Sequence, residues 1–198
     1  MLRQRTIKRA IHAIGIGVHS GNKVRMTLRP AGENTGILFV RTDAGHAVVR
    51  ARAQNVSDTT LATRISENGV QVSTVEHLMS ALWGLGIDNV VVEINNDEVP
   101  IMDGSAAPFV ERILEVGVDA LPAPRRVIRL TRAVEVVDGE RFARLDPADR
   151  FSIDCGIEYD APIVAKQRLD FTPHNGAFIS EIGPARTFGF AEDVARLR

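Results

Sequence analysis

The segment Ser73 to Gly86, Ser-Thr-Val-Glu-His-Leu-Met-Ser-Ala-Leu-Trp-Gly-Leu-Gly, is the stretch that decides the fold. Its apolar residues at positions 75, 78, 79 and 82 fall at i, i+3, i+4 and i+7, which predicts a helix with one buried face. A glycine at position 84 or 86 is expected to end it. The β-branched run from Asn89 to Ile94 follows and predicts a buried strand, so helix and strand alternate here.

Strand patterns precede this helix, and a second helix follows it. Val24, Met26 and Leu28 alternate with polar residues, and further strands are predicted at 36–42 and 47–53. After a turn at residues 102–105, Pro108 suits the first turn of a second helix and Gly117 its end. The predicted core face of that helix consists of Phe109, Val110, Ile113 and Leu114. These patterns predict an α+β protein.

A change in pattern predicts two domains. Residues 119–126 contain Pro122 and Pro124 without periodicity, which predicts a linker between a first domain, 1–120, and a second, 127–198. Further strands are predicted at 127–137, 141–145 and 151–159, and helices at 175–181 and 191–198. The last helix has no stop signal, so we expect the second domain to be incomplete. A natural C-terminal helix that frays is the open alternative.

Composition narrows the classes of function. The chain has 24 basic and 25 acidic residues and a net charge of -1, which argues against binding to nucleic acid or to an anionic membrane surface. Its single cysteine, Cys155, excludes an intrachain disulfide and a cysteine-based zinc module. Without a signal-like segment or an apolar run of spanning length, the cytoplasm is the expected location.

The adjacent pair Glu76 and His77 is the strongest candidate for chemistry. Both residues fall off the apolar stripe of the predicted helix, and a hydrolytic zinc site needs an imidazole ligand and a carboxylate near the attacking water. A structural interpretation stays open, because Ser73-x-x-Glu76 is also the pattern of a capping box. In that case Glu76 binds the Ser73 backbone and His77 is a surface histidine.

Three other side chains are weaker candidates. His19, between Gly17 and Gly21, could bind a substrate oxygen or have no role. Thr187 could donate a hydrogen bond to an oxyanion, or be an ordinary strand threonine beside two core phenylalanines. Tyr159 could stack on a planar ligand or simply pack at a strand end.

Several long motifs, in this order and spacing, resemble one known family. They are Gly15-Ile-Gly-Val-His-Ser-Gly21, Ser73-Thr-Val-Glu-His-Leu78, Gly84-Leu-Gly-Ile-Asp-Asn89, Val99-Pro-Ile-Met-Asp-Gly-Ser-Ala106 and Ala185-Arg-Thr-Phe-Gly-Phe190. The chain resembles the UDP-3-O-acyl-N-acetylglucosamine deacetylases of Gram-negative bacteria, over about residues 3–198. The resemblance implies two domains of similar topology, each a layered sandwich of sheet and helices, and the committed step of lipid A synthesis.

The resemblance also implies a zinc-dependent mechanism. His77 matches a Zn²⁺ ligand, Glu76 matches the general base that activates the attacking water, and Thr187 matches a donor to the oxyanion. Acetate and the free amino sugar are the products. The other zinc ligands of the family, on a His-x-x-x-Asp helix, and its later acid histidine have no counterpart in this sequence. We therefore expect the 198-residue chain by itself to be inactive, because a catalytic zinc takes three protein ligands.

The implied partner is a small molecule, acylated UDP-N-acetylglucosamine. Family positions that contact the substrate or lie near the metal match His19, Thr60, Leu61, Tyr159, Phe188 and Phe190. Tyr159 matches an aromatic residue that stacks on uracil, and the two phenylalanines match the acyl-chain passage. Asp103 matches a family aspartate without an assigned role, and a monomer is the expected state. Two alternatives stay open: a truncated or non-catalytic relative that binds the nucleotide sugar, and a structural protein with a fortuitous Glu-His pair.

Overall fold

The computed structural model describes residues 2–174 and 176–190 and divides into two compact units. Met1–Arg125 and Ile179–Arg198 belong to the first unit, and Arg126–Phe178 is the second. Strands in several sheets and two α-helices make up the described part of the chain, so the predicted α+β class is confirmed. The helix predicted at 191–198 lies outside the described residues.

The main sheet of the first unit forms its core. Its order is β2-β3-β9-β4-β5, and β4 and β9 are the parallel pair. The strands are β2 (Ile11–Ile16), β3 (Lys23–Pro30), β4 (Ile37–Arg41), β5 (Ala47–Arg50) and β9 (Val90–Ile94). The alternation in β3 is confirmed, because Val24, Met26 and Leu28 are buried while their neighbours face outward.

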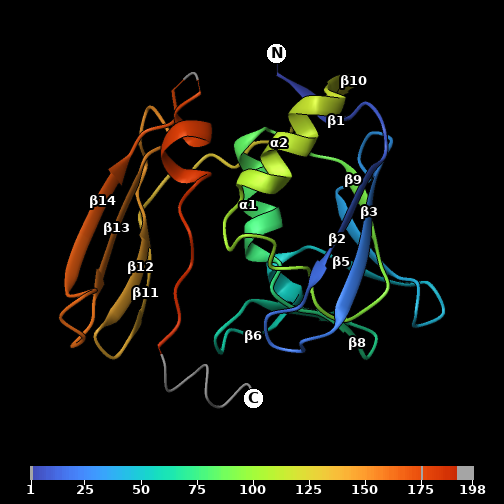
Figure 1. Cartoon of the computed structure of the whole chain (residues 1–198). Coiled ribbons are helices and arrows are strands. Elements are labelled where there is room, and N and C mark those ends of the chain that lie inside the picture. The colour runs from blue at the N-terminus through green and yellow to red at the C-terminus, as the bar shows by residue number, and fades with distance from the viewer. Residues whose placement is uncertain (1, 175, 191–198) are drawn as a thin grey trace. The chain divides into compact units, whose positions relative to one another are not determined.

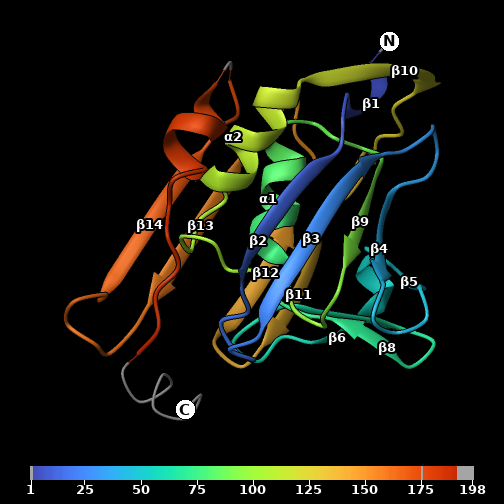
Figure 2. The same cartoon turned by 45° about the vertical axis from the view of Figure 1, so that its right-hand side comes forward.

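Two helices, α1 (Glu76–Gly84) and α2 (Ala107–Val116), cover one face of this sheet (Figures 1 and 2). Leu78 and Leu82 of α1 are buried, which confirms the predicted stripe. On α2, Phe109, Val110 and Ile113 are buried as predicted, and Gly117 ends the helix at φ 82°. Leu114 is 51% exposed, so its assignment to the core face is wrong.

The segment predicted to be a linker is a strand. β10 (Val118–Pro124) pairs antiparallel with β1 (Arg3–Ile7). Arg3 pairs with Pro124 and Arg5 with Ala120, so the register shifts between these two pairs, in a stretch that contains Pro122. The linker prediction is therefore wrong for residues 119–124, because prolines are tolerated at a bulge or edge of a sheet.

A hydrogen-bond cluster joins this strand pair to the end of α1. Asp88 Oδ2 accepts hydrogen bonds from Arg5 N–H at 2.8 Å and from Arg125 Nη2 at 2.8 Å. Arg5 Nη1 also binds the Leu85 carbonyl at 3.0 Å, and Asn89 Nδ2 donates to Gln4 Oε1 at 2.9 Å. The motif at residues 84–89 thus connects elements far apart in sequence.

A small three-stranded sheet precedes Glu76 and His77 in the sequence. It consists of β6 (Val56–Asp58), β7 (Arg64–Glu67) and β8 (Val70–Val72), after a 3₁₀ turn at Ala53–Asn55. The strand predicted at 47–53 therefore ends at Arg50. Beyond β8, Ser73 forms an isolated parallel bridge with Glu98.

The second unit consists of two β-hairpins. Its strands are β11 (Val134–Asp138), β12 (Arg141–Leu145), β13 (Ile153–Glu158) and β14 (Lys166–Phe171), paired as β11-β12 and β13-β14. The strand predicted at 127–137 begins only at Val134, so the first part of that prediction is wrong. Strand β14 was not predicted. In place of the helix predicted at 175–181, the structure has a π-helical turn at Phe178–Ile182. In the described part of the chain, no helix is both long and apolar enough to cross a membrane.

Candidate active site

Glu76 and His77 are the first two residues of α1. The predicted capping box does not form: Ser73 N–H donates to the Asp97 carbonyl at 2.8 Å, and the N-cap position, Val75, makes no side-chain cap bond. Ser73 forms the β-bridge with Glu98. The next residue, Thr74, has a positive φ of 56°, and the chain changes direction there. The capping interpretation of Glu76 is therefore wrong.

The carboxylate of Glu76 is held on one side only. Its Oε1 accepts a hydrogen bond from Thr63 N–H at 2.8 Å. Glu76 Oε2 and His77 Nδ1 are buried and have no hydrogen-bond partner among the described residues. Such atoms cost about 1–3 kcal/mol each unless a ligand, ion or water satisfies them. This adjacent acceptor and ring nitrogen suit a site where an imidazole binds a metal and a carboxylate receives a proton.

Within residues 2–174 and 176–190, this chemistry fits part of a zinc site. His77 can supply one imidazole ligand, and catalytic zinc takes three protein ligands. No group of three or more histidine, cysteine, aspartate or glutamate residues in this part of the chain has a metal-binding arrangement. The described residues can therefore provide one ligand and the neighbouring carboxylate.

The loop with Thr60 and Leu61 is tied to the Glu76 carboxylate through Thr63. Thr60 N–H donates to Asp58 Oδ1 at 3.0 Å, and this bond holds the pKa of Asp58 below its ordinary value. Leu61 has a φ of 58°, and its side chain is exposed. An apolar residue in the left-handed region is uncommon, and such strain gathers at ligand sites.

His19 lies in a loop that an unpredicted residue, Glu98, holds in place. His19 N–H donates to Glu98 Oε1 and Ser20 N–H to Oε2, both at 2.9 Å. Burial of Glu98 tends to raise its pKa, but the hydrogen bonds from His19 and Ser20 outweigh burial, so the pKa is lower than usual. The sequence gives little indication of the role of Glu98, because the hydrogen-bond partners of its carboxylate are about 25 and 80 residues away.

Thr187 lies beside the turn that precedes α2. Its N–H donates to the Gly104 carbonyl at 2.8 Å, and Arg186 Nε donates to the Asp103 carbonyl at 2.7 Å. Residues 184–190 are not in a strand, so the alternative of an ordinary strand threonine is wrong. The exposed position of Thr187 leaves its hydroxyl accessible to a ligand.

Asp103 has a structural role in the same turn. Its Oδ1 accepts hydrogen bonds from Ser105 N–H at 2.9 Å and from Ser105 Oγ at 2.8 Å. Ser105 Oγ in turn accepts Ala107 N–H at 3.1 Å, at the start of α2. Desolvation tends to raise the pKa of Asp103, but the bonds from Ser105 lower it more, so the net shift is downward.

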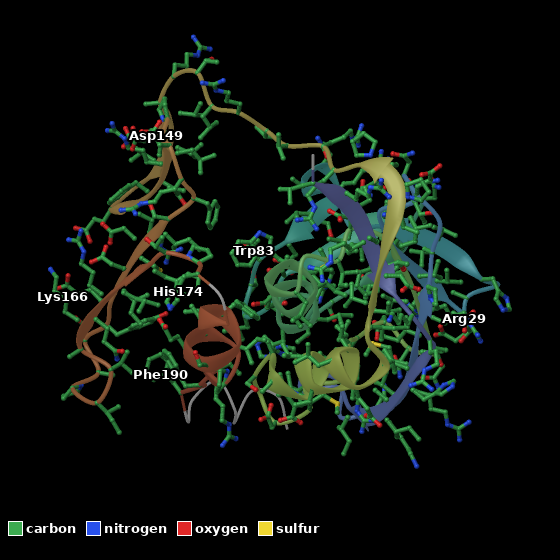
Figure 3. The ribbon with its side chains drawn as sticks, turned by 90° about the horizontal axis from the view of Figure 1, so that it is seen from above. Arg29, Trp83, Asp149, Lys166, His174 and Phe190 are labelled. Carbon is green, nitrogen blue, oxygen red and sulfur yellow. The ribbon has the colours of Figure 1, made fainter. Side chains whose placement is uncertain are left out.

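The aromatic candidates are divided between the units. Phe188 and Phe190 belong to the first unit, and their rings meet edge to face with centroids 5.7 Å apart. Phe188 is 52% exposed, which contradicts the alternative that it is a core residue. Its partner Phe190 is labelled in Figure 3. Tyr159 belongs to the second unit, where its N–H binds the Ala165 carbonyl at 3.0 Å. Stacking of Tyr159 on uracil therefore stays a prediction.

Comparison with known proteins gives a consistent result over nearly the whole chain. The model of the UDP-3-O-acyl N-acetylglycosamine deacetylase family matches residues 4–198. The UDP-3-O-acyl-N-acetylglucosamine deacetylase of Pseudoalteromonas atlantica is 49% identical over 200 residues, which are 98% of this chain and 65% of that protein. The deacetylase of Chromohalobacter salexigens is 50% identical over 203 residues, 100% of this chain and 66% of its own length. The chain thus spans slightly less than two thirds of the length of these curated relatives.

Proposed function

The chain belongs to the UDP-3-O-acyl N-acetylglycosamine deacetylase family, and we therefore propose that it carries the N-terminal part of a zinc-dependent amide hydrolase. The substrate is acylated UDP-N-acetylglucosamine, and hydrolysis of its acetamide gives acetate and the free amine. The reaction is the committed step of lipid A biosynthesis. The proposal rests on two buried atoms, Glu76 Oε2 and His77 Nδ1, which have no hydrogen-bond partner in the described part of the chain.

Glu76 is the general base of the proposed reaction. Thr63 N–H occupies Oε1 and fixes the carboxylate, so Oε2 is the oxygen that takes a proton from the attacking water. His77 holds the metal, which when bound polarises the amide carbonyl and makes water a better nucleophile. In the family a later histidine, which has no counterpart in this sequence, helps to protonate the departing amine.

Thr187 and the loop residues bind the substrate in this proposal. The Thr187 hydroxyl donates a hydrogen bond to the oxygen that gains negative charge as water adds to the carbonyl. His19, Thr60 and Leu61 border the polar part of the substrate, and Phe188 and Phe190 border its acyl chain. Tyr159 stacks on the uracil ring. A cytoplasmic location and a monomeric state stay predictions.

The test compares two substitutions in the intact gene product, the complete protein that the gene encodes. We expect Glu76→Gln to lower kcat at least about 100-fold, the lower range for loss of general base catalysis, while bound zinc stays unchanged. His77→Ala is expected to lose zinc, because the site then lacks one of three ligands. Elemental analysis after gel filtration and a deacetylation assay measure the two effects.

The same experiment separates the alternatives. Normal turnover by Glu76→Gln would remove the general-base role, and full zinc content in His77→Ala would remove the ligand role. A wild-type gene product that binds the nucleotide sugar without releasing acetate would establish the non-catalytic alternative. Arg29→Gln is a matched control, because Arg29 of β3 pairs with Glu93 of β9 and lies on the side away from the helices (Figure 3).

A further inference from the structure

Glu98 is a buried carboxylate to which the proposed reaction gives no part. Glu98 is 1% exposed. Among the described residues, it is the only buried residue with an ionisable side chain. A carboxylate is costly to bury unless hydrogen bonds or ion pairs satisfy its oxygens. A well-packed apolar residue in its place often makes the protein equally stable. The position of its partners therefore indicates what this carboxylate contributes.

Those partners come from two separate segments of the candidate site. The N–H groups of His19 and Ser20 each bind one carboxylate oxygen. Thr74 Oγ1 donates to Oε1 at 3.2 Å, from a position two residues before Glu76. One side chain thus joins the loop that carries His19 to the entry of the helix that carries Glu76 and His77.

The backbone on both sides is shaped to receive the carboxylate. A Cβ on Gly17 would lie 2.2 Å from Glu98 Oε2, so only glycine lets the loop approach this closely. Thr74 is buried with a φ of 56°, an unfavourable conformation for a β-branched residue. Such a conformation persists where surrounding contacts determine it, and the bond to Glu98 is one of these contacts.

We propose that Glu98 is a positioning residue, whose carboxylate fixes the loop at 17–22, and with it His19, against the chain entering Glu76 and His77. The proposal rests on the proposed function in one respect, the role of His19 as a substrate contact. The connection between the two segments itself is independent of any activity.

The first experiment measures amide hydrogen exchange in the 198-residue protein. Glu98→Gln replaces one accepting oxygen with an NH₂ group, so we expect exchange at His19 and Ser20 to accelerate about 10- to 100-fold, the factor for a lost hydrogen bond to a charged group. Amides in β3 and β9 should not change. The control is Asp97→Asn, a neighbouring carboxylate whose side chain contacts Gln71. Unchanged exchange at residues 19 and 20 would overturn the proposal.

A second variant covers the case in which Glu98→Gln does not fold. Gly17→Ala keeps the carboxylate but places a methyl carbon 2.2 Å from Glu98 Oε2 and 2.3 Å from Ser20 Oγ, so His19 is the more specific reporter. We expect the same selective acceleration at His19 and Ser20. If both amides stay protected in Gly17→Ala, the hydrogen bonds to Glu98 are not what fixes the loop at 17–22, and the proposal is wrong.

The second experiment is a double-mutant cycle in the intact gene product. If Glu98 acts through His19, Glu98→Gln and His19→Ala each lower kcat/KM about 10-fold or more through KM, and the double variant is no worse than His19→Ala within about threefold. Zinc content stays that of the wild type. Additive losses would mean that Glu98 acts independently of His19, which would overturn its role in positioning that residue. A wild type without deacetylase activity would contradict the proposed function, and the exchange data would still decide the role of Glu98.

Discussion

Two glutamates in the first unit have opposite surroundings. Glu98 is fully paired, with both oxygens bound by N–H groups. Glu76 has one oxygen bound and one without a partner in the described part of the chain. A paired carboxylate fixes structure, whereas a half-paired one keeps an acceptor ready for a proton. The difference arises from contacts 13 to 79 residues apart in sequence.

Glu98 should make the protein less stable in acid. Its pKa is lower in the folded state than the ordinary glutamate value of 4.5, so its stabilising contribution is present above that value and is lost as the pH falls through the folded-state pKa. We expect wild type to exceed Glu98→Gln in free energy of unfolding by about 1–3 kcal/mol at pH 7. Urea unfolding between pH 7 and pH 3 should show this difference shrinking below about pH 4.5. A difference independent of pH would mean that shape, and not charge, is what matters at position 98.

At the residue level, the sequence locates the reactive pair but not its support. Glu76 and His77 stand out because they interrupt an apolar stripe and match a long motif. The Ser73-x-x-Glu76 spacing is identical in a capping box and in this site, and the Asp97 carbonyl, 24 residues away, decides between them. Local spacing carries no information about such a partner.

At the level of elements, prediction succeeds where one face is buried. The β3 alternation and the α1 stripe each reflect one apolar face against the core. It fails in β10, where prolines lie in a bulged strand pair, and in β14, whose sequence Lys-Gln-Arg-Leu-Asp-Phe is mostly polar. A strand without a buried face has no hydrophobic period to detect.

Two leucines on the helices should respond very differently to truncation. Leu78 is fully buried, and Leu78→Ala is expected to cost about 2–5 kcal/mol through lost contacts and a cavity. Leu114 is 51% exposed, and Leu114→Ala should cost under about 0.5 kcal/mol. Urea unfolding followed by circular dichroism measures both. Equal costs would mean that α2 presents a different face to the core.

At the level of the whole molecule, the two units differ in how much they bury. The main sheet of the first unit packs against two helices, whereas the strands β11 to β14 are exposed except for Phe171. A two-stranded hairpin is only marginally stable by itself. The sequence did not predict this contrast, because β11 and β12 carry enough valine and phenylalanine to suggest a core.

Amide hydrogen exchange should be faster in the second unit than in the first. We expect amides in residues 134–171 to exchange at least about 10-fold faster than those of β3 and β9, because few buried contacts resist local opening. Mass spectrometry of peptides from the 198-residue protein, sampled from seconds to hours, measures the difference. Equal protection in both units would contradict this view of the hairpins.

The pairing of β1 with β10 has a consequence for synthesis on the ribosome. The first strand to emerge pairs with residues 118–124, and at about 5–20 residues per second it waits on the order of ten seconds for its partner. Thr187, which binds Gly104, emerges later still, after the whole second unit. Thr187 therefore joins the candidate site only after the second unit has been made, and until β10 emerges the nascent chain presents an unpaired strand edge to chaperones.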